Sequence, residues 1–234
     1  MKVLASIQNQ DKILTNSPLD NILDGGIEKR SITQIYGPPG SGKTNIALFL
    51  SIMVAKSGKK VAYMDTEGGI SIERIQQIAG DDFDNVAKNI VVFEPNTFEE
   101  QEDDLNVAES WIAANKGLVD LLVIDSAVAL YRVLEVKGSQ VTSILGKQMG
   151  QLSRLARKYD IAIVVTNQIY PSFGEENENT VSPVGGTVLQ YWSKTIIELE
   201  RNYENGNRIA TLKRSKTLKE GLIVEFSITD KGIE

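Results

Sequence analysis

Residues 37–44 read Gly37-Pro38-Pro39-Gly40-Ser41-Gly42-Lys43-Thr44. This stretch matches the G-x-x-x-x-G-K-[ST] pattern, and it lies between an apolar segment at 32–36 typical of a strand and a long apolar segment at 45–56 typical of a buried helix. Glycines allow positive φ angles, so backbone N–H groups turn inwards around a phosphate. The sequence therefore predicts a nucleoside triphosphate site that residues 37–44 build.

Two residues of this stretch carry the chemistry. Lys43 brings a positive charge to the β- and γ-phosphates, and the hydroxyl of Thr44 is placed to bind Mg²⁺. Asp125 ends the apolar segment 121–124, and a carboxylate at the carboxyl end of a central strand can hold the same ion through a water. We therefore expect ATP and Mg²⁺ as cofactors, with Thr44 and Asp125 at the metal.

Glu67 is the candidate that activates the attacking water. It follows a short predicted strand at 61–64, and ligands of open α/β sheets bind at the carboxyl ends of the strands. The chain has no histidine, so a carboxylate is the available general base. The alternative is a solvent-exposed loop glutamate.

The order of elements predicts the fold class. Predicted strands and helices alternate as far as residue 186, after which segments 195–199, 208–212 and 222–228 indicate strands, with a hairpin turn at Asn205-Gly206. This pattern predicts an α/β fold with a mostly parallel, twisted sheet flanked by helices and an antiparallel extension at its C-terminal end. We assign residues 31–234 to one core domain and residues 1–30 to a short N-terminal segment with a lead-in helix.

Composition excludes several function classes. The 234 residues include no cysteine and no histidine, which rules out disulfides, thiol catalysis and histidine bases. The net charge is −6, so a nucleic-acid site has to be local. We see no secretory signal and no apolar run of the roughly 20 residues that span a bilayer, so we expect a cytoplasmic protein without membrane contact.

Five segments resemble, in order, the motifs of the RecA/RadA recombinase family. One such motif alone is modestly specific, whereas five in order, from about residue 13 to the C-terminus, are highly specific. The segments are residues 37–44; Asp65-Thr66-Glu67-Gly68-Gly69 followed by Glu73-Arg74; Leu122-Val123-Ile124-Asp125-Ser126-Ala127 with Ala129-Leu130-Tyr131-Arg132; Thr166-Asn167-Gln168; and Pro183-Val184-Gly185-Gly186.

The resemblance implies a RecA-like P-loop ATPase core and assigns roles to residues. Lys43, Glu67 and Gln168 would be catalytic, Gln168 by sensing the γ-phosphate, and Arg74 would join the nucleotide-binding residues. The family's longer recombinases carry a helix-hairpin-helix domain, for which we expect no room here. They polymerise through an F-x-x-A segment before the core, where this chain has no phenylalanine ahead of Phe49. This profile matches the family's short archaeal paralogues.

Such a paralogue is expected to bind ATP, hydrolyse it weakly, bind DNA and assist homologous recombination and repair. The implied partners are DNA, a RadA-type recombinase, a Holliday-junction nuclease and further copies of this chain. Two other classes compete: a KaiC-like regulatory ATPase without a DNA role, and an adaptor that uses ATP only as a conformational switch. The segment 129–132 fits the recombinases better than the KaiC-like proteins.

Two loops and one basic strand are the candidate DNA contacts. Arg132 and Lys137 belong to the first loop, whereas Tyr170 and Phe173 belong to the second, whose aromatic rings could stack on bases. The second loop also holds three glutamates, at 175, 176 and 178, which would weaken phosphate binding. Residues 208–219 are basic without an acid, and strand alternation would place Arg214 and Lys216 on one face. They could contact a neighbour's nucleotide or DNA, or simply protect a sheet edge.

Overall fold

The structure is a computed structural model that describes residues 11–133, 138–170, 182–183 and 186–234. Its helices are α1 (Asp20–Leu23), α2 (Lys43–Lys56), α3 (Ile72–Ala79), α4 (Phe83–Asn89), α5 (Phe98–Ala114), α6 (Gly138–Tyr159) and α7 (Gly186–Trp192), with 3-10 helices η2 (Gly80–Asp82) and η3 (Leu130–Val133). Its strands are β1 (Lys12–Ile13), β2 (Ile27–Glu28), β3 (Ile32–Gly37), β4 (Lys60–Asp65), β5 (Ile90–Phe93), β6 (Val119–Asp125), β7 (Ala162–Tyr170), β8 (Ser182–Pro183), β9 (Thr195–Arg201), β10 (Arg208–Arg214), β11 (Ile223–Phe226), β12 (Ile228–Thr229) and β13 (Gly232–Ile233).

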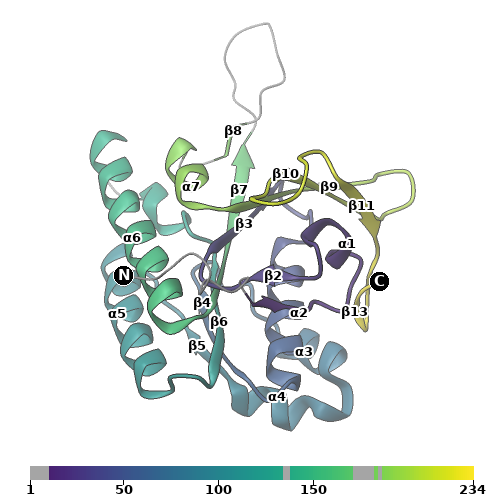
Figure 1. Cartoon of the computed structure of the whole chain (residues 1–234), viewed down its shortest axis with the longest axis horizontal. Coiled ribbons are helices and arrows are strands. Elements are labelled where there is room, and N and C mark those ends of the chain that lie inside the picture. Colours follow the sequence, from purple (N-terminus) through teal and green to yellow (C-terminus); the bar gives the residue numbers. More distant parts are fainter. Residues whose placement is uncertain (1–10, 134–137, 171–181, 184–185) are drawn as a thin grey trace, which may run out of the picture.

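A sheet of nine strands runs through the centre of the molecule (Figure 1). Its order is β11-β10-β9-β3-β7-β6-β4-β5, and β8 pairs with β7 outside this path. The strands from β9 to β5 in this order are parallel, whereas β10 and β11 continue the sheet antiparallel to β9. The predicted fold class, a mostly parallel sheet with a C-terminal antiparallel extension, is confirmed.

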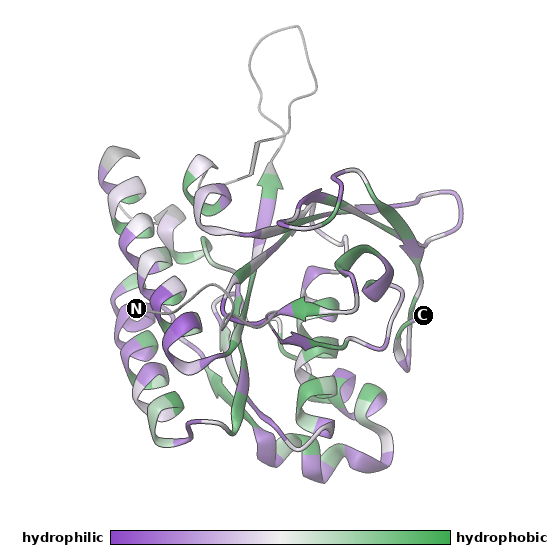
Figure 2. Ribbon diagram, in the orientation of Figure 1, coloured by the Kyte–Doolittle hydropathy of each residue, from purple (hydrophilic) through white to green (hydrophobic). Residues whose placement is uncertain are grey.

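Helices cover both faces of this sheet. One hydrophobic core lies between the sheet and helices α1 to α4, and a second lies between the opposite face and helices α5 to α7. Figure 2 shows the hydrophobic residues concentrated along the central strands between these two layers. Strands covered on both faces need apolar side chains throughout, which explains the uninterrupted run at 121–124. Within the described residues, no helix is both long and apolar enough to cross a bilayer.

Strand register brings distant motifs to one edge of the sheet. Asp65 at the end of β4 is the register partner of Asp125 at the end of β6. Gly37 at the end of β3 is the partner of Gln168 near the end of β7. Because the strands are parallel, all four residues lie at the same carboxyl edge, where open α/β sheets bind their ligands.

The structure corrects one expectation about the C-terminal half and adds one helix. Residue 216 was expected to continue a strand with Arg214, but β10 ends at Arg214. The hydroxyl of Ser215 accepts hydrogen bonds from the N–H groups of Thr217 and Leu218, which turns the chain there. The alternation that would place Arg214 and Lys216 on one face is therefore wrong. Helix α7, which the sequence analysis did not predict, begins at Gly186.

Candidate nucleotide-binding site

The loop 37–42 and the first turn of α2 form the floor of the site. Gly42 caps α2 with a φ of 102°, a left-handed backbone conformation that favours glycine. The ammonium of Lys43, which is 8% exposed, donates hydrogen bonds to the carbonyls of Gly37 at 3.0 Å and Pro38 at 2.9 Å. These two hydrogen bonds hold the Lys43 side chain against the loop 37–42.

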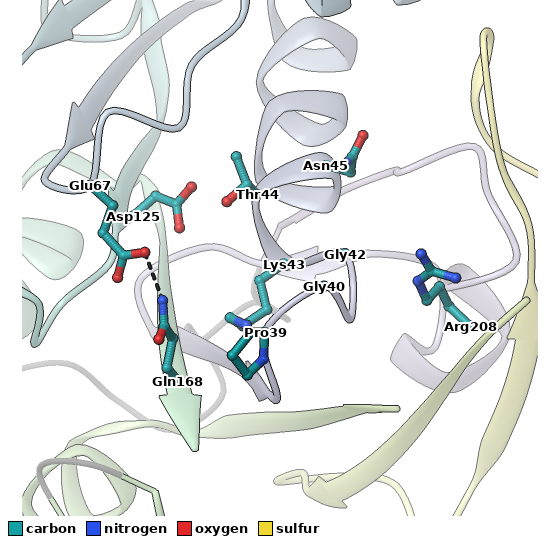
Figure 3. Close-up of a pocket in the computed structure, with 10 residues that line it drawn as sticks. All are labelled: Pro39, Gly40, Gly42, Lys43, Thr44, Asn45, Glu67, Asp125, Gln168 and Arg208. Atoms are coloured by element: carbon teal, nitrogen blue, oxygen red, sulfur yellow. Dashed lines mark hydrogen bonds between the residues drawn. The ribbon is translucent and has the colours of Figure 1, made fainter. Parts of the chain in front are cut away.

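A cavity of about 310 Å³ lies above this loop (Figure 3). Its volume falls in the range of roughly 300–1,000 Å³ that ligand pockets occupy. The cavity draws side chains from the loop, from the ends of β4, β6 and β7, and from the start of β10. Its lining residues are Pro39, Gly40, Gly42, Lys43, Thr44, Asn45, Glu67, Asp125, Gln168 and Arg208.

Asp125 is buried at the inner wall of this cavity, with 5% of its surface exposed. Three hydroxyls donate to its carboxylate: Tyr63 at 2.8 Å, Thr166, and Thr44 from the first turn of α2. Burial raises the pKa of Asp125 above its ordinary value, and these hydrogen bonds oppose that rise. The contact between Thr44 and Asp125 brings together the two residues that the sequence analysis assigned to the metal.

This donor set fits Mg²⁺. Magnesium prefers oxygen ligands, and in nucleotide enzymes one or two carboxylates hold it together with substrate phosphates and water. Thr44 and Asp125 supply a hydroxyl and a carboxylate side by side. Groups of three or more acidic, histidine or cysteine side chains that could hold a metal without a substrate are absent from the described residues. The arrangement suits an ion that arrives with a nucleotide.

Asp65 builds the loop that carries Glu67. Its carboxylate accepts hydrogen bonds from the backbone N–H groups of Glu67, Gly69 and Ile70 at 3.2, 3.0 and 2.8 Å. The hydroxyl of Thr66 donates to the carbonyl of Ser126 and accepts from its N–H, both at 2.9 Å. The loop after β4 is therefore fastened to the segment after β6, which places Glu67 at the cavity.

Both carboxylate oxygens of Glu67 are hydrogen-bonded. The hydroxyl of Ser126 donates to Oε1 at 2.9 Å, and the side-chain amide of Gln168 donates to Oε2 at 2.7 Å. Figure 3 shows Glu67 and Gln168 facing each other on the side of the cavity next to Asp125. The two residues that the resemblance assigned to water activation and γ-phosphate sensing thus contact each other, although 101 positions separate them in the chain.

The remaining predicted nucleotide residues lie just outside the cavity. The carbonyls of Gly37 and Pro38 accept hydrogen bonds from Lys43, and Ser41, within the loop, is fully buried. Arg74 on α3 does not line the cavity either; its Nε donates to the side chain of the lining residue Asn45 at 2.8 Å.

The candidate DNA contacts are dispersed. Arg132 lies in η3 and Tyr170 ends β7, whereas Lys137 and Phe173 fall outside the described residues. Arg214 donates to the carbonyl of Gln190 in α7. Lys216 forms an ion pair with Glu28 of β2 at 2.9 Å. Neither Arg214 nor Lys216 lines the cavity of its own chain.

Sequence reasoning missed several members of the site. Asn45 and Arg208 line the cavity, and Tyr63, Asp65 and Ser126 hold the carboxylates in place. Asp65 and Ser126 sit inside motifs that were recognised, so a polar residue next to a predicted functional one was the available signal. Arg208 was noted only as part of a basic strand, because its position depends on how the C-terminal hairpin packs.

A phosphate-binding loop at the carboxyl edge of a parallel sheet, faced by acidic side chains from the neighbouring strands, defines a RecA-like P-loop protein. The chain belongs to the Rad51 family, whose model matches residues 10–234. Relatives from archaea carry the name "DNA repair and recombination protein RadB". One from Methanobrevibacter smithii is 58% identical and one from Methanosphaera stadtmanae is 52% identical, each covering 100% of both chains.

A solved structure agrees with these relatives. The chain superimposes on "Crystal structure of the RadB recombinase" with a TM-score of 0.79 and 36% identity, and the match covers 92% of this chain and 95% of that one. The relatives and this solved structure thus carry the same name, RadB, within the family that the motif order indicated. The resemblance drawn from the sequence is confirmed.

Proposed function

We propose that this protein binds ATP with Mg²⁺, hydrolyses it slowly, binds DNA and assists homologous recombination and DNA repair. The observation that carries the proposal is the contact of Glu67 with Gln168 and Ser126 beside the phosphate-binding loop. It joins the end of β4 to the end of β7 at the side of the cavity where Thr44 and Asp125 meet. The names of the relatives support the role in recombination and repair.

In the proposed mechanism, loop 37–42 surrounds the β-phosphate with backbone N–H groups, and the ammonium of Lys43 contacts the β- and γ-phosphates. Thr44, and Asp125 through a water, would hold Mg²⁺, which when bound would supply positive charge to the phosphates. Glu67 orients the attacking water and accepts its proton. Because Ser126 and Gln168 fix the carboxylate of Glu67, the water is held in one place.

Hydrolysis is expected to be slow in an isolated subunit. Charge develops on the γ-phosphate oxygens during transfer, and an arginine or lysine next to them accelerates phosphoryl transfer by orders of magnitude. Among the described lining residues the cations are Lys43 and Arg208, and Figure 3 shows Arg208 on the side away from Glu67. A second cation at the γ-phosphate would therefore come from a neighbouring subunit, for which Arg214 and Lys216 are the candidates.

Strand β7 supports a coupling between nucleotide and DNA. Gln168 precedes Ile169, whose register partner is Pro183, and Tyr170 pairs with Ser182. The candidate DNA loop, about residues 170–183, therefore follows directly after Gln168, the proposed γ-phosphate sensor, and its two ends pair as the end of β7 and β8. A change in the Gln168 contact on nucleotide binding would bias this connection between two states. In this proposal residues 31–234 form the ATPase core, and DNA and a RadA-type recombinase are the partners.

The nucleotide part of the proposal is tested with Lys43→Ala and Glu67→Gln. The equilibrium affinity for ATP and the single-turnover hydrolysis rate are measured for both variants and the unchanged protein. Lys43→Ala should lower ATP affinity by at least about tenfold, since charge-assisted hydrogen bonds contribute about 1.5–3 kcal/mol. Glu67→Gln should keep ATP affinity and lose hydrolysis. Unchanged affinity in Lys43→Ala would refute the site.

The DNA part is tested by titrating single- and double-stranded DNA across salt concentrations, with and without ATP. Phosphate contacts make the logarithm of affinity fall linearly with the logarithm of salt. We expect this dependence, and an affinity that changes when ATP is bound. Nucleotide hydrolysis without any DNA binding would contradict the recombination role and favour a regulatory ATPase of the KaiC type.

A further inference from the structure

Arg208, the first residue of β10, lines the nucleotide cavity but has no role in the mechanism above. Its side chain lies next to the loop, with Nε and Cγ 3.7 and 3.8 Å from the position that a Cβ atom on Gly42 would take. Figure 3 shows its guanidinium on the Asn45 side of the loop, away from Glu67 and Gln168. The cavity therefore has an acidic end and a basic end.

The basic end is built at an energetic cost. Arg208 lies directly opposite Arg201 in the register of β9 and β10, and like charges in opposite positions of a strand pair destabilise it. Burial and then the nearby charge of Arg201 lower the pKa of Arg208. Arg201 in turn lies over the ring of the exposed Tyr203, 5.7 Å from its centroid. An anion beside Arg208 in the cavity would relieve the repulsion.

The described positions around Arg208 provide only neutral hydrogen-bond acceptors for its guanidinium. One of its terminal nitrogens donates to the carbonyls of Gly206 and Asn207, which are neutral acceptors. Its Nε is buried and has no partner among the described residues. A buried donor without a partner costs about 1–3 kcal/mol, so an acceptor that meets the guanidinium from the cavity would offset this cost.

The orientation expected for a nucleotide in the cavity indicates which of its phosphates lies next to Arg208. The γ-phosphate lies at the acidic end, because Lys43, the Mg²⁺ residues and Glu67 act on it. The backbone of a phosphate-binding loop and the first turn of its helix hold the β- and then the α-phosphate. Arg208 lies beside Gly42 and Asn45 at that second position. We propose that Arg208 binds the α-phosphate of a nucleotide held by its own subunit.

This inference rests on the proposed nucleotide binding and adds a separable prediction. ATP and ADP share the α-phosphate, so removing Arg208 should weaken both by the same factor. Glu67 and Gln168 act on the γ-phosphate, so their removal should affect ATP hydrolysis and spare ADP affinity. The nucleobase plays no part in the contact, so ATP and GTP should lose affinity equally.

The experiment measures equilibrium binding of ATP, ADP and GTP to the full chain carrying Arg208→Gln. We expect a loss of about 10- to 100-fold for each nucleotide, the size of one charge-assisted contact. Arg208→Lys retains a point charge and should fall between Arg208→Gln and the unchanged protein. The matched control is Arg201→Gln, which removes the same charge from the opposing strand but does not line the cavity; it should cost less than about fivefold.

Three outcomes would overturn the assignment. The first is unchanged ATP and ADP affinity in Arg208→Gln while Lys43→Ala loses binding, which leaves the proposed function standing. The second is an equal loss in Arg201→Gln and Arg208→Gln, which would reflect the local field rather than a contact. The third is a loss of DNA affinity with nucleotide affinity intact, which would make the arginine pair a DNA site. If the unchanged protein binds no nucleotide, both the inference and the proposed function fail.

Discussion

Replacing Tyr63 with phenylalanine removes one oxygen atom from the support of Asp125. The hydroxyl of Tyr63, a residue with 0% exposure, donates at 2.8 Å to a carboxylate that is itself 5% exposed. The aromatic ring keeps its packing, so the loss is that of a hydrogen bond to a charged acceptor, about 1.5–3 kcal/mol. We expect Tyr63→Phe to lower the free energy of unfolding by this amount near neutral pH.

Tyr131→Phe is the matched control. Tyr131 is 4% exposed, and its hydroxyl also donates at 2.8 Å, but to the neutral side-chain amide oxygen of Gln148. The same atom is removed at the same distance and burial, so the two variants differ in the charge of the acceptor. A neutral hydrogen bond contributes about 0.5–1.5 kcal/mol, so Tyr131→Phe should cost roughly half as much.

The pH dependence separates the two variants further. The hydrogen bond from Tyr63 lowers the pKa of Asp125, so removing it raises a folded-state pKa that burial has already raised. A group whose pKa is higher in the folded state contributes stability below its unfolded pKa and loses it as the pH rises through the folded pKa. The cost of Tyr63→Phe is therefore largest at high pH and shrinks as Asp125 protonates.

Urea denaturation of both variants and the unchanged protein at several pH values measures these free energies. The cost of Tyr63→Phe should fall towards that of Tyr131→Phe as the pH falls through the raised pKa of Asp125, whereas the cost of Tyr131→Phe should stay constant. Equal, pH-independent losses in both variants would show that Asp125 is not a buried carboxylate supported by Tyr63.

Two further predictions concern the packing of β13 against α2 and the hydrogen-bond support of Glu67. Gly232 has a φ of 123°, and a Cβ atom there would lie 2.3 Å from Phe49 of α2. Gly232→Ala should cost about 2–5 kcal/mol in urea unfolding, against about 1–2 kcal/mol for Gly58→Ala, which has a φ of 80° and open space. Ser126→Ala removes one donor to Glu67. A contribution of about 1–2 kcal/mol to positioning corresponds to a slowing of single-turnover hydrolysis of about 5- to 30-fold, with ADP affinity unchanged.

Local patterns of the chain predicted the elements and the centre of the site. The phosphate-binding loop, the strand before it and the helix after it are contiguous, and each of their properties depends on neighbouring residues. Helix α2 is apolar on all sides because it is covered by the sheet on one side and by α3, α4 and β13 on the others. The carboxylate at 125 was found because it directly follows an apolar run typical of a buried strand, and the carboxylate at 67 because it lies three residues after a short predicted strand.

The structure decided which strand ends meet. The sequence does not specify the strand order, and a different order would separate Glu67 from Gln168, which lie 101 positions apart, and from Ser126, which lies 59 positions away. The tertiary structure also determines the contacts of the basic residues after Asn207. Arg214 hydrogen-bonds to α7 and Lys216 forms an ion pair with β2, whereas Arg208 lines the cavity.

A local stretch of the chain was thus enough to predict a triphosphate site, since the glycines, lysine and threonine of the loop lie within eight consecutive residues. The surroundings of that predicted site came from the fold: the hydroxyls on Asp125, the partners of Glu67 and the arginine beside Gly42. These contacts depend on strand register and on hairpin packing. Both arise from burying side chains across the whole sheet, which no local stretch of sequence encodes.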